Sequence, residues 1–180
     1  MPFDRKPVLP RVTLVLGGAR SGKSRYAEAL IEDSAEHALY LATAEPLDEE
    51  MRRRIALHRA RRGPRWTTLE EPAEIAGVLR RAAGGRPILV ECLTLWLSNL
   101  LARGRDIDAA RADLLAATAA CAAPIVFVAN EVGLGIVPEN ALARAFRDHA
   151  GALNRELAAA AQHAVFIAAG LPLVLKDKRA

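Results

Sequence analysis

Hydrophobic residues along the chain form short apolar runs, separated by longer stretches in which they recur at helical spacing. Five runs are apolar almost throughout and rich in β-branched residues, which is typical of strands buried on both faces of a sheet. These predicted strands cover residues 12–16, 38–43, 87–91, 124–130 and 164–170. The stretches between them predict helices over residues 23–33, 48–62, 72–83, 93–102, 107–122 and 138–161. Residues 65–70 are predicted to be extended.

The regular alternation of strands and helices predicts an α/β fold of three layers, with a mostly parallel central sheet flanked by helices. A chain of 180 residues fits a single domain with one sizeable core. Residues 1–11 are rich in proline and are predicted to form a loose N-terminal arm, so the domain spans residues 12–180. Ligands bind such sheets at the carboxyl ends of the strands, where this chain places residues 17–24, 42–44, 91 and 130–135.

One of these strand ends carries a phosphate-binding motif. The sequence GGARSGKS fits the pattern G-x-x-x-x-G-K-[ST], follows a predicted strand and opens a predicted helix. Its residues are Gly17, Gly18, Ala19, Arg20, Ser21, Gly22, Lys23 and Ser24. The loop amides and the helix N-terminus would hold phosphate oxygens, while Lys23 would reach the β- and γ-phosphates and Ser24 would bind Mg²⁺. The motif predicts the P-loop NTPase type of fold; the alternative is a glycine-rich turn that arises by chance.

A second strand end supplies an acid. Glu91 closes its predicted strand, and P-loop proteins hold an acid on the magnesium side at such a position. We therefore expect Glu91 to serve the nucleotide or, with Ser24, Mg²⁺; the alternative is a carboxylate that caps the following helix. These features predict a domain that binds ATP or GTP, and they leave open whether it is a kinase, an ATPase or a switch.

Composition and charge narrow the class of partner. The chain is 52% hydrophobic and 26% charged, with a formal net charge of +4, which is ordinary for a globular protein. Seven arginines lie within residues 51–66, so the charge is local and favours a phosphate ligand over a nucleic acid. No apolar run approaches the ~18 residues that cross a membrane, and we expect a cytoplasmic protein without a signal peptide. Cys92 and Cys121 are predicted to be reduced core residues, with a disulfide as the alternative.

A single histidine, His58, lies among these arginines. On a helix, Arg54, Arg61 and Arg62 would lie about one turn away from it. Their positive charge disfavours protonation of the imidazole, which leaves a neutral ring that can attack a phosphate held by the arginines. The alternative, which the spacing alone favours, is an incidental histidine on a solvated, arginine-rich helix.

Several separated stretches resemble the bifunctional adenosylcobinamide kinase / adenosylcobinamide-phosphate guanylyltransferase family of cobalamin synthesis. They are LVLGGARSGKSRYAEAL, YLATAEPLDEEMRRRIALHRARRGPRWTTLEEP, LVECLTLWLSNLL, VANEVGLGIVPENALARAFRDHAGALNRELAAAA and FIAAGLPLVLK. The likeness extends from Val12 to Lys176. The NEVGLGIVPEN block and the segment around His58 are more specific to the family than the phosphate loop is.

By position, the resemblance implies that His58 is the guanylylated histidine and that the phosphate loop binds GTP or ATP. It implies further nucleotide contacts from Ala42, Thr43, Ala44, Arg59, Ala60, Arg61, Arg62, Glu70 and Glu91. The family accepts aspartate or glutamate at the position of Glu91. The N-terminal arm is longer than expected for the family, and the resemblance implies no role for it.

The resemblance implies two reactions and an assembly. ATP or GTP phosphorylates adenosylcobinamide; GTP then guanylylates His58 with release of pyrophosphate, and adenosylcobinamide phosphate takes up the GMP to give adenosylcobinamide-GDP. The family also implies a homotrimer, and we expect the helix over residues 48–62 to move when nucleotide binds. The residues alone leave two alternatives: a P-loop small-molecule kinase in which His58 is inert, and a P-loop nucleotide-binding regulatory protein.

Overall fold

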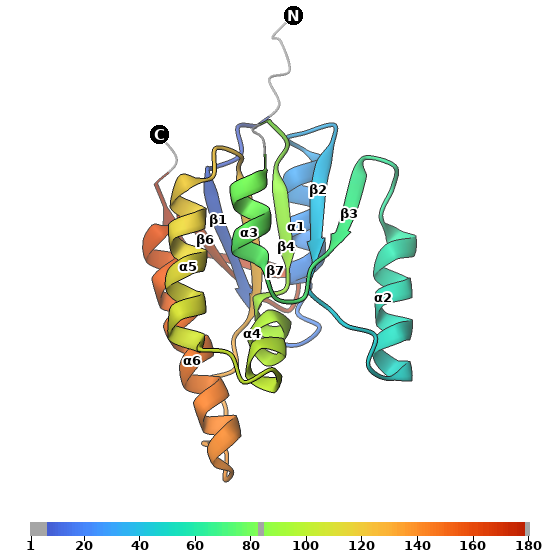
Figure 1. Ribbon diagram of the computed structural model, residues 1–180. Helices are drawn as coiled ribbons and strands as arrows, with labels where there is room; N and C mark the ends of the chain where they lie inside the picture. The colour runs from blue at the N-terminus through green and yellow to red at the C-terminus, as the bar shows by residue number, and fades with distance from the viewer. Residues whose placement is uncertain (1–6, 83–84, 179–180) are drawn as a thin grey trace, which may run out of the picture.

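Seven strands form one central sheet in the order β3-β2-β4-β5-β1-β6-β7 (Figure 1). The structure is a computed structural model that describes residues 7–82 and 85–178. The strands are β1 (Val12–Gly17), β2 (Ala38–Ala42), β3 (Trp66–Glu70), β4 (Ile88–Glu91), β5 (Ile125–Asn130), β6 (His163–Ala168) and β7 (Leu171–Asp177). The first six pair in parallel, and β7 pairs antiparallel with β6. The predicted mostly parallel sheet is therefore confirmed.

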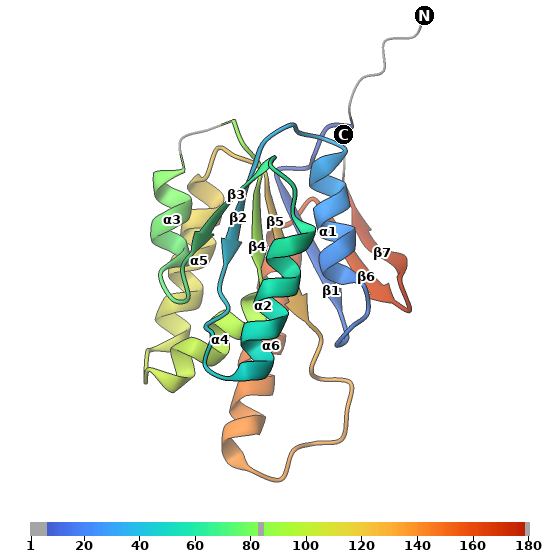
Figure 2. The same cartoon turned by 90° about the vertical axis from the view of Figure 1, so that its right-hand side faces the viewer.

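Helices cover both faces of the sheet and complete the three predicted layers. They are α1 (Lys23–Glu32), α2 (Glu49–Arg61), α3 (Ile75–Arg81), α4 (Leu93–Ala102), α5 (Ile107–Ala120) and α6 (Ala141–Ala160). Figure 2 shows α3 and α5 on one side of the sheet and α1 on the other, with α2 standing beside α1 at the β3 edge. No helix among the described residues is long and apolar enough to cross a membrane.

Each face of the sheet carries its own apolar core because successive strand side chains point in opposite directions. In β5, Phe127 packs in the core under α3 to α6, whereas Val126 and Val128 pack on the α1 side. On that side, Ala27 and Ile31 of α1 are fully buried against the strands. Both cysteines are buried, as predicted, and neither takes part in a disulfide.

Helix α2 differs from the other helices because none of its residues is buried. Its N-terminus is capped by Asp48, whose carboxylate accepts a hydrogen bond from the Met51 amide at 2.7 Å. Acidic residues fill its first turn and basic residues its last turn, an order that suits the helix dipole. Local capping and polar contacts with neighbours, not a hydrophobic core, therefore hold α2 in place.

The structure corrects the sequence-based expectations at the C-terminus. The sequence predicted no strand after residue 170, yet β7 extends the sheet there. Ala168 pairs with Leu171 across a two-residue turn, and both turn residues, Ala169 and Gly170, have positive φ angles of 51° and 80°. Such turns suit the twist of a hairpin but usually carry Asn-Gly or Asp-Gly. The alanine weakened that signal, and Pro172 is tolerated because β7 is an edge strand.

Two predicted helices begin later than expected. The helix expected over residues 72–83 begins at Ile75, because the Glu71 carboxylate accepts hydrogen bonds from the next amides and forms a turn of its own; residue 83 lies outside the described residues. The helix expected from residue 138 begins at Ala141, capped by Asn140. The predicted arm is described from residue 7 onward, and its Leu9 packs into the core on the α1 side.

Candidate active site

The phosphate loop joins β1 to α1 and adopts the conformation that its glycines allow. Gly22, which precedes the helix, has a φ of 95°, a left-handed conformation that favours glycine. A Cβ on Gly17 would lie 2.6 Å from the Ile167 carbonyl oxygen of β6, so a side chain there would displace the backbone. Lys23 is buried, and its ammonium donates to the Gly18 carbonyl oxygen at 3.1 Å. The loop is therefore wrapped around its own lysine at the carboxyl end of β1.

Ser24 and Glu91 meet at the start of α1, as the sequence predicted. The Ser24 hydroxyl donates to Oε1 of Glu91 at 2.7 Å. Burial raises the pKa of Glu91 to about 7, although the Ser24 hydrogen bond and the charge of Lys23 act in the opposite direction. Its other oxygen, Oε2, is buried and has no hydrogen-bond partner among the described residues. A buried carboxylate oxygen with spare capacity beside a serine hydroxyl is a donor set that suits Mg²⁺.

Little else in the described residues resembles a metal site. No group of three or more histidine, cysteine, aspartate or glutamate side chains gathers there. Magnesium commonly takes one or two protein ligands and completes its shell with phosphate oxygens and water. Ser24 and Glu91 would therefore hold Mg²⁺ together with a nucleotide rather than alone.

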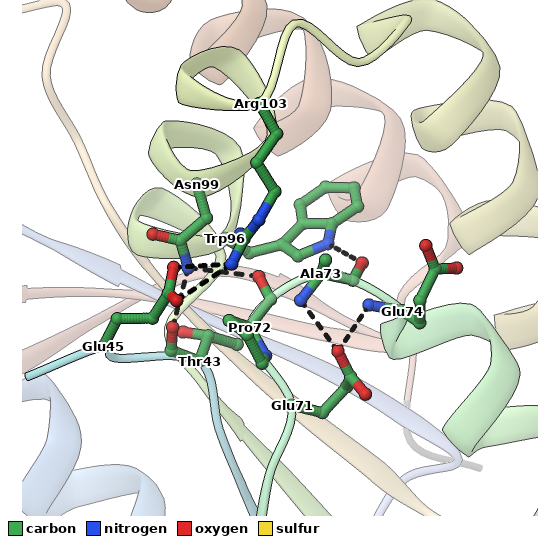
Figure 3. Close-up of polar contacts among 9 residues, drawn as sticks. All are labelled: Thr43, Glu45, Glu71, Pro72, Ala73, Glu74, Trp96, Asn99 and Arg103. Atoms are coloured by element: carbon green, nitrogen blue, oxygen red, sulfur yellow. Dashed lines mark hydrogen bonds and ion pairs between the residues drawn. The ribbon is translucent and has the colours of Figure 1, made fainter.

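The end of β2 and the turn after it, residues 42–44, are fixed by a buried hydrogen-bond network, part of which is drawn in Figure 3. The Thr43 hydroxyl donates to the Cys92 carbonyl and accepts from the Cys92 amide, both at 2.8 Å. The side-chain amide of Asn99 on α4 donates from Nδ2 to the backbone carbonyl oxygens of Thr43, at 2.8 Å, and Pro72, at 3.1 Å. Sequence reasoning missed Asn99; its signal was a lone amide within the apolar helix LTLWLSNLLA.

A charged pair extends this network toward α2. Arg103, at the end of α4, donates to both carboxylate oxygens of Glu45 at 2.9 and 2.8 Å (Figure 3). Trp96, on the same helix, donates from its indole nitrogen to the Ala73 carbonyl at 2.7 Å. Helix α4 thereby holds both the chain that leaves β2 and the chain that leaves β3.

His58 lies on the last two turns of α2 and is half-buried. Its Nδ1 lies 3.4 Å from NH2 of Arg61, and its carbonyl oxygen accepts from Nε of Arg62 at 3.0 Å. Burial lowers the pKa of His58, and the charges of Arg61, Arg62, Arg54 and Lys23 lower it further. The neutral ring that the sequence predicted is therefore supported. The charge of the phosphate-loop lysine, Lys23, contributes to the lowered pKa of this ring.

Of the remaining predicted residues, Arg59 and Arg62 contact side chains of β3. Arg59 forms an ion pair with Glu70. Arg62 stacks over the Tyr40 ring, with its guanidinium carbon 3.7 Å from the ring centroid, and donates to the Thr68 hydroxyl at 3.1 Å. An open cavity lies here, lined by Arg59, Arg62, Gly63, Trp66, Thr68, Leu69 and Glu70. Ala60 is exposed on the same helix.

The candidate residues therefore fall into two groups. The phosphate loop, Ser24 and Glu91 gather at the carboxyl ends of β1 and β4, while Arg59 and Glu70 meet at the β3 edge. Arg61 contacts Glu28 of α1, and His58 lies beside Arg61. One buried residue of this region, Glu28 on α1, was absent from the sequence-based set, because its amphipathic helix alone does not show that a charged side chain points inward.

The family of the chain follows from sequence comparison. Residues 13–175 match the family described as cobinamide kinase / cobinamide phosphate guanyltransferase. The chain belongs to this family. Curated relatives support the assignment: the bifunctional adenosylcobalamin biosynthesis protein CobP of Pseudomonas aeruginosa is 49% identical over 92% of this chain and 97% of that protein. The corresponding protein CobU of Escherichia coli is 42% identical over 91% of this chain and 98% of its own length.

Solved structures, an ATPase among them, share the fold of this family member. A prototypical ATPase from the type III secretion system of pathogenic bacteria matches with a TM-score of 0.55 and 12% identity, over 94% of this chain and 57% of that chain. The flagellar accessory protein FlaH from Methanocaldococcus jannaschii matches with a TM-score of 0.52 and 13% identity, over 94% of this chain and 80% of that chain. At such low identity the likeness concerns the fold, and it confirms the predicted P-loop NTPase type.

Proposed function

We propose that this member of the cobinamide kinase / cobinamide phosphate guanyltransferase family is a bifunctional enzyme that builds the nucleotide loop of cobalamin. It phosphorylates adenosylcobinamide with ATP or GTP and then transfers GMP from GTP to adenosylcobinamide phosphate. The observation that carries the proposal is the presence, in one family member, of an intact phosphate loop and, on helix α2, an arginine-flanked histidine whose lowered pKa favours the neutral ring.

The phosphoryl transfer would use the phosphate loop. Its amides and Lys23 would hold the β- and γ-phosphates, and Ser24 and Glu91 would hold Mg²⁺. Bound Mg²⁺ would neutralise charge on the phosphate oxygens. The hydroxyl of adenosylcobinamide then attacks the γ-phosphorus and gives its proton to water, the bond to the β-phosphate oxygen breaks, and the nucleoside diphosphate leaves with that electron pair.

The nucleotidyl transfer would use His58. The lone pair of a neutral ring nitrogen attacks the α-phosphorus of GTP, and pyrophosphate leaves with the electrons of the broken P–O bond. A phosphate oxygen of adenosylcobinamide phosphate then attacks the GMP phosphorus, and the P–N electrons return to the ring. The residues that would contact GTP are those of the phosphate loop together with Ala42, Thr43, Ala44, Arg59, Ala60, Arg61, Arg62, Glu70 and Glu91.

The assembly and compartment belong to the same proposal. The family resemblance implies a cytoplasmic homotrimer, and we expect α2 to shift when GTP binds. The absence of buried residues in α2 supports such a shift. Exposed apolar side chains on β7 and in the loop before α6 give the chain surfaces that subunits could cover; they include Leu171, Leu173, Leu175, Leu134 and Ile136.

A product assay tests the two activities separately. Purified protein is given adenosylcobinamide, Mg²⁺ and GTP, and the corrinoid products are separated by chromatography. We expect adenosylcobinamide-GDP from the wild type, and adenosylcobinamide phosphate alone from His58→Ala, because only the second step needs the histidine. Lys23→Ala should lower the first step by at least about 100-fold. Formation of adenosylcobinamide-GDP by His58→Ala would contradict the covalent route.

A further inference from the structure

A buried carboxylate on α1 points at the helix that carries His58. Glu28 is only 6% exposed, although it lies on a surface helix. Its Oε1 accepts a hydrogen bond from NH2 of Arg61 on α2 at 2.9 Å, while the Arg61 side chain itself is 44% exposed. Buried carboxylates are costly unless they are paired, so this contact fixes where the Arg61 guanidinium lies.

The same nitrogen of Arg61 also contacts the candidate nucleophile. NH2 of Arg61 lies 3.4 Å from Nδ1 of His58. A guanidinium has only donors and stays charged, so Nδ1 must present its lone pair to Arg61. A neutral imidazole has a single N–H, and in this arrangement the proton therefore lies on Nε2.

This arrangement leaves neither ring nitrogen of His58 ready to attack. The lone pair of Nδ1 is directed at Arg61, and Nε2 carries the proton. Attack through Nδ1 requires Arg61 to leave, and attack through Nε2 requires the proton to change nitrogen, which the Arg61 contact opposes. The nucleotide-free arrangement is therefore a resting one with respect to His58.

We propose that Glu28 is a positioning residue that keeps Arg61 on Nδ1 of His58 until the triphosphate of the incoming nucleotide takes Arg61 away. Phosphate oxygens compete well for a guanidinium because they accept charge-assisted, bidentate hydrogen bonds. Once Arg61 turns to the phosphates, it leaves the histidine lone pair free and neutralises the group that the histidine attacks. The inference deepens the proposed function and rests on it.

The position of the ring proton gives a readout that does not depend on turnover. Two-bond ¹⁵N–¹H spectra of ¹⁵N-histidine-labelled, nucleotide-free protein report which nitrogen of each histidine is protonated, and His58→Ala identifies the His58 signals. We expect the Nε2–H form in the wild type and a mixture of both forms in Glu28→Gln, which keeps the size of the side chain and removes its charge. An unchanged His58 spectrum in Glu28→Gln would overturn the proposal.

Kinetics of guanylyl loading supply the second readout. Since Glu28 competes with the triphosphate for Arg61, Glu28→Gln should lower the KM for GTP in the loading step by about 3- to 10-fold, as expected when a charged hydrogen bond becomes a neutral one. Arg61→Gln should also give a mixture of both protonated forms of the His58 ring. It should nevertheless slow the guanylylation of His58 at least about 10-fold, because the phosphate loses the guanidinium that binds it. A KM that is unchanged or raised in Glu28→Gln would overturn the proposal.

A matched control lies one turn along α1. Glu32 accepts a hydrogen bond from the Trp66 indole on β3 rather than from a side chain of α2, so Glu32→Gln should match the wild type in both readouts. Thermal unfolding of each variant shows whether it is folded. If the wild type takes up no GMP, the proposed function fails, whereas the ring-proton spectrum still decides whether Glu28 sets the state of His58.

Discussion

At the scale of single residues, the site depends on two groups whose surroundings shift their protonation in useful directions. His58 is held neutral by partial burial and by the arginines around it, which suits a nucleophile. Glu91 is enclosed beside Ser24 and retains a carboxyl oxygen without a hydrogen-bond partner among the described residues. In both cases the surroundings suit a chemical role better than they suit local stability, as is common at functional sites.

The lowered pKa of His58 predicts where its ring titrates. Burial and the neighbouring positive charges favour the neutral form, so the neutral ring should persist to a pH below its ordinary pKa of about 6.5. NMR titration of the His58 ring in nucleotide-free protein measures this directly, with the protein unfolded in urea as the reference. Arg54→Gln should raise the midpoint slightly, because burial is the larger cause. A folded midpoint at or above that of the unfolded chain would contradict the account.

The raised pKa of Glu91 predicts a dependence of stability on pH. Since the folded-state pKa is about 7 and the ordinary value is 4.5, the unfolded chain releases this proton first as the pH rises. The free energy of unfolding should therefore fall between pH 4.5 and 7, by up to about 3 kcal/mol from this group. Glu91→Gln should remove that fall and stabilise the nucleotide-free protein at pH 8, while it impairs the kinase step.

Urea unfolding of both proteins at pH 5 and pH 8, without nucleotide or Mg²⁺, measures the effect. For each protein, the free energy of unfolding at pH 8 is compared with that at pH 5. If this difference is the same in the wild type and in Glu91→Gln, Glu91 is ionised without cost in the folded state and the prediction is wrong.

At the scale of elements, α4 fixes the chain segments that leave β2 and β3 beside the site. Asn99 joins the ends of β2 and β3 through two carbonyl oxygens, and Arg103 holds Glu45 in the chain that leads to α2. Helix α2 lacks buried residues, so its position relies on such contacts at its N-terminal side and on Glu28 and Tyr40 at its C-terminal side.

The Asn99 contacts predict a linked loss of stability and nucleotide affinity. Asn99→Ala leaves the buried Thr43 carbonyl oxygen without this donor, which should lower the free energy of unfolding by about 1–3 kcal/mol. The turn over residues 42–44 should then shift, and the KM for GTP should rise several-fold. Ser98→Ala, an exposed neighbour on the same helix, is the control. Loss of stability with an unchanged KM would show that the network serves the fold alone.

At the scale of the whole molecule, the sequence predicted most of the architecture and only part of the site. The apolar runs and the phosphate motif are local signals, so β1, α1 and the pairing of Ser24 with Glu91 could be foreseen. Residues that matter through distant contacts could not. Glu28 matters through its contact with Arg61, which lies 33 residues further along the chain, and β7 depends on a hairpin turn with an uncommon alanine.

The central claim is that one chain phosphorylates adenosylcobinamide and carries GMP on His58. Purified protein is incubated with Mg²⁺ and GTP labelled with ³²P at either the α- or the γ-position, beside His58→Ala. The account predicts acid-labile label on the wild type from α-labelled GTP, none from γ-labelled GTP, and none on the variant. If neither form of GTP labels the protein, although the protein still binds GTP, the account is contradicted. His58 would then be an incidental histidine on an arginine-rich helix.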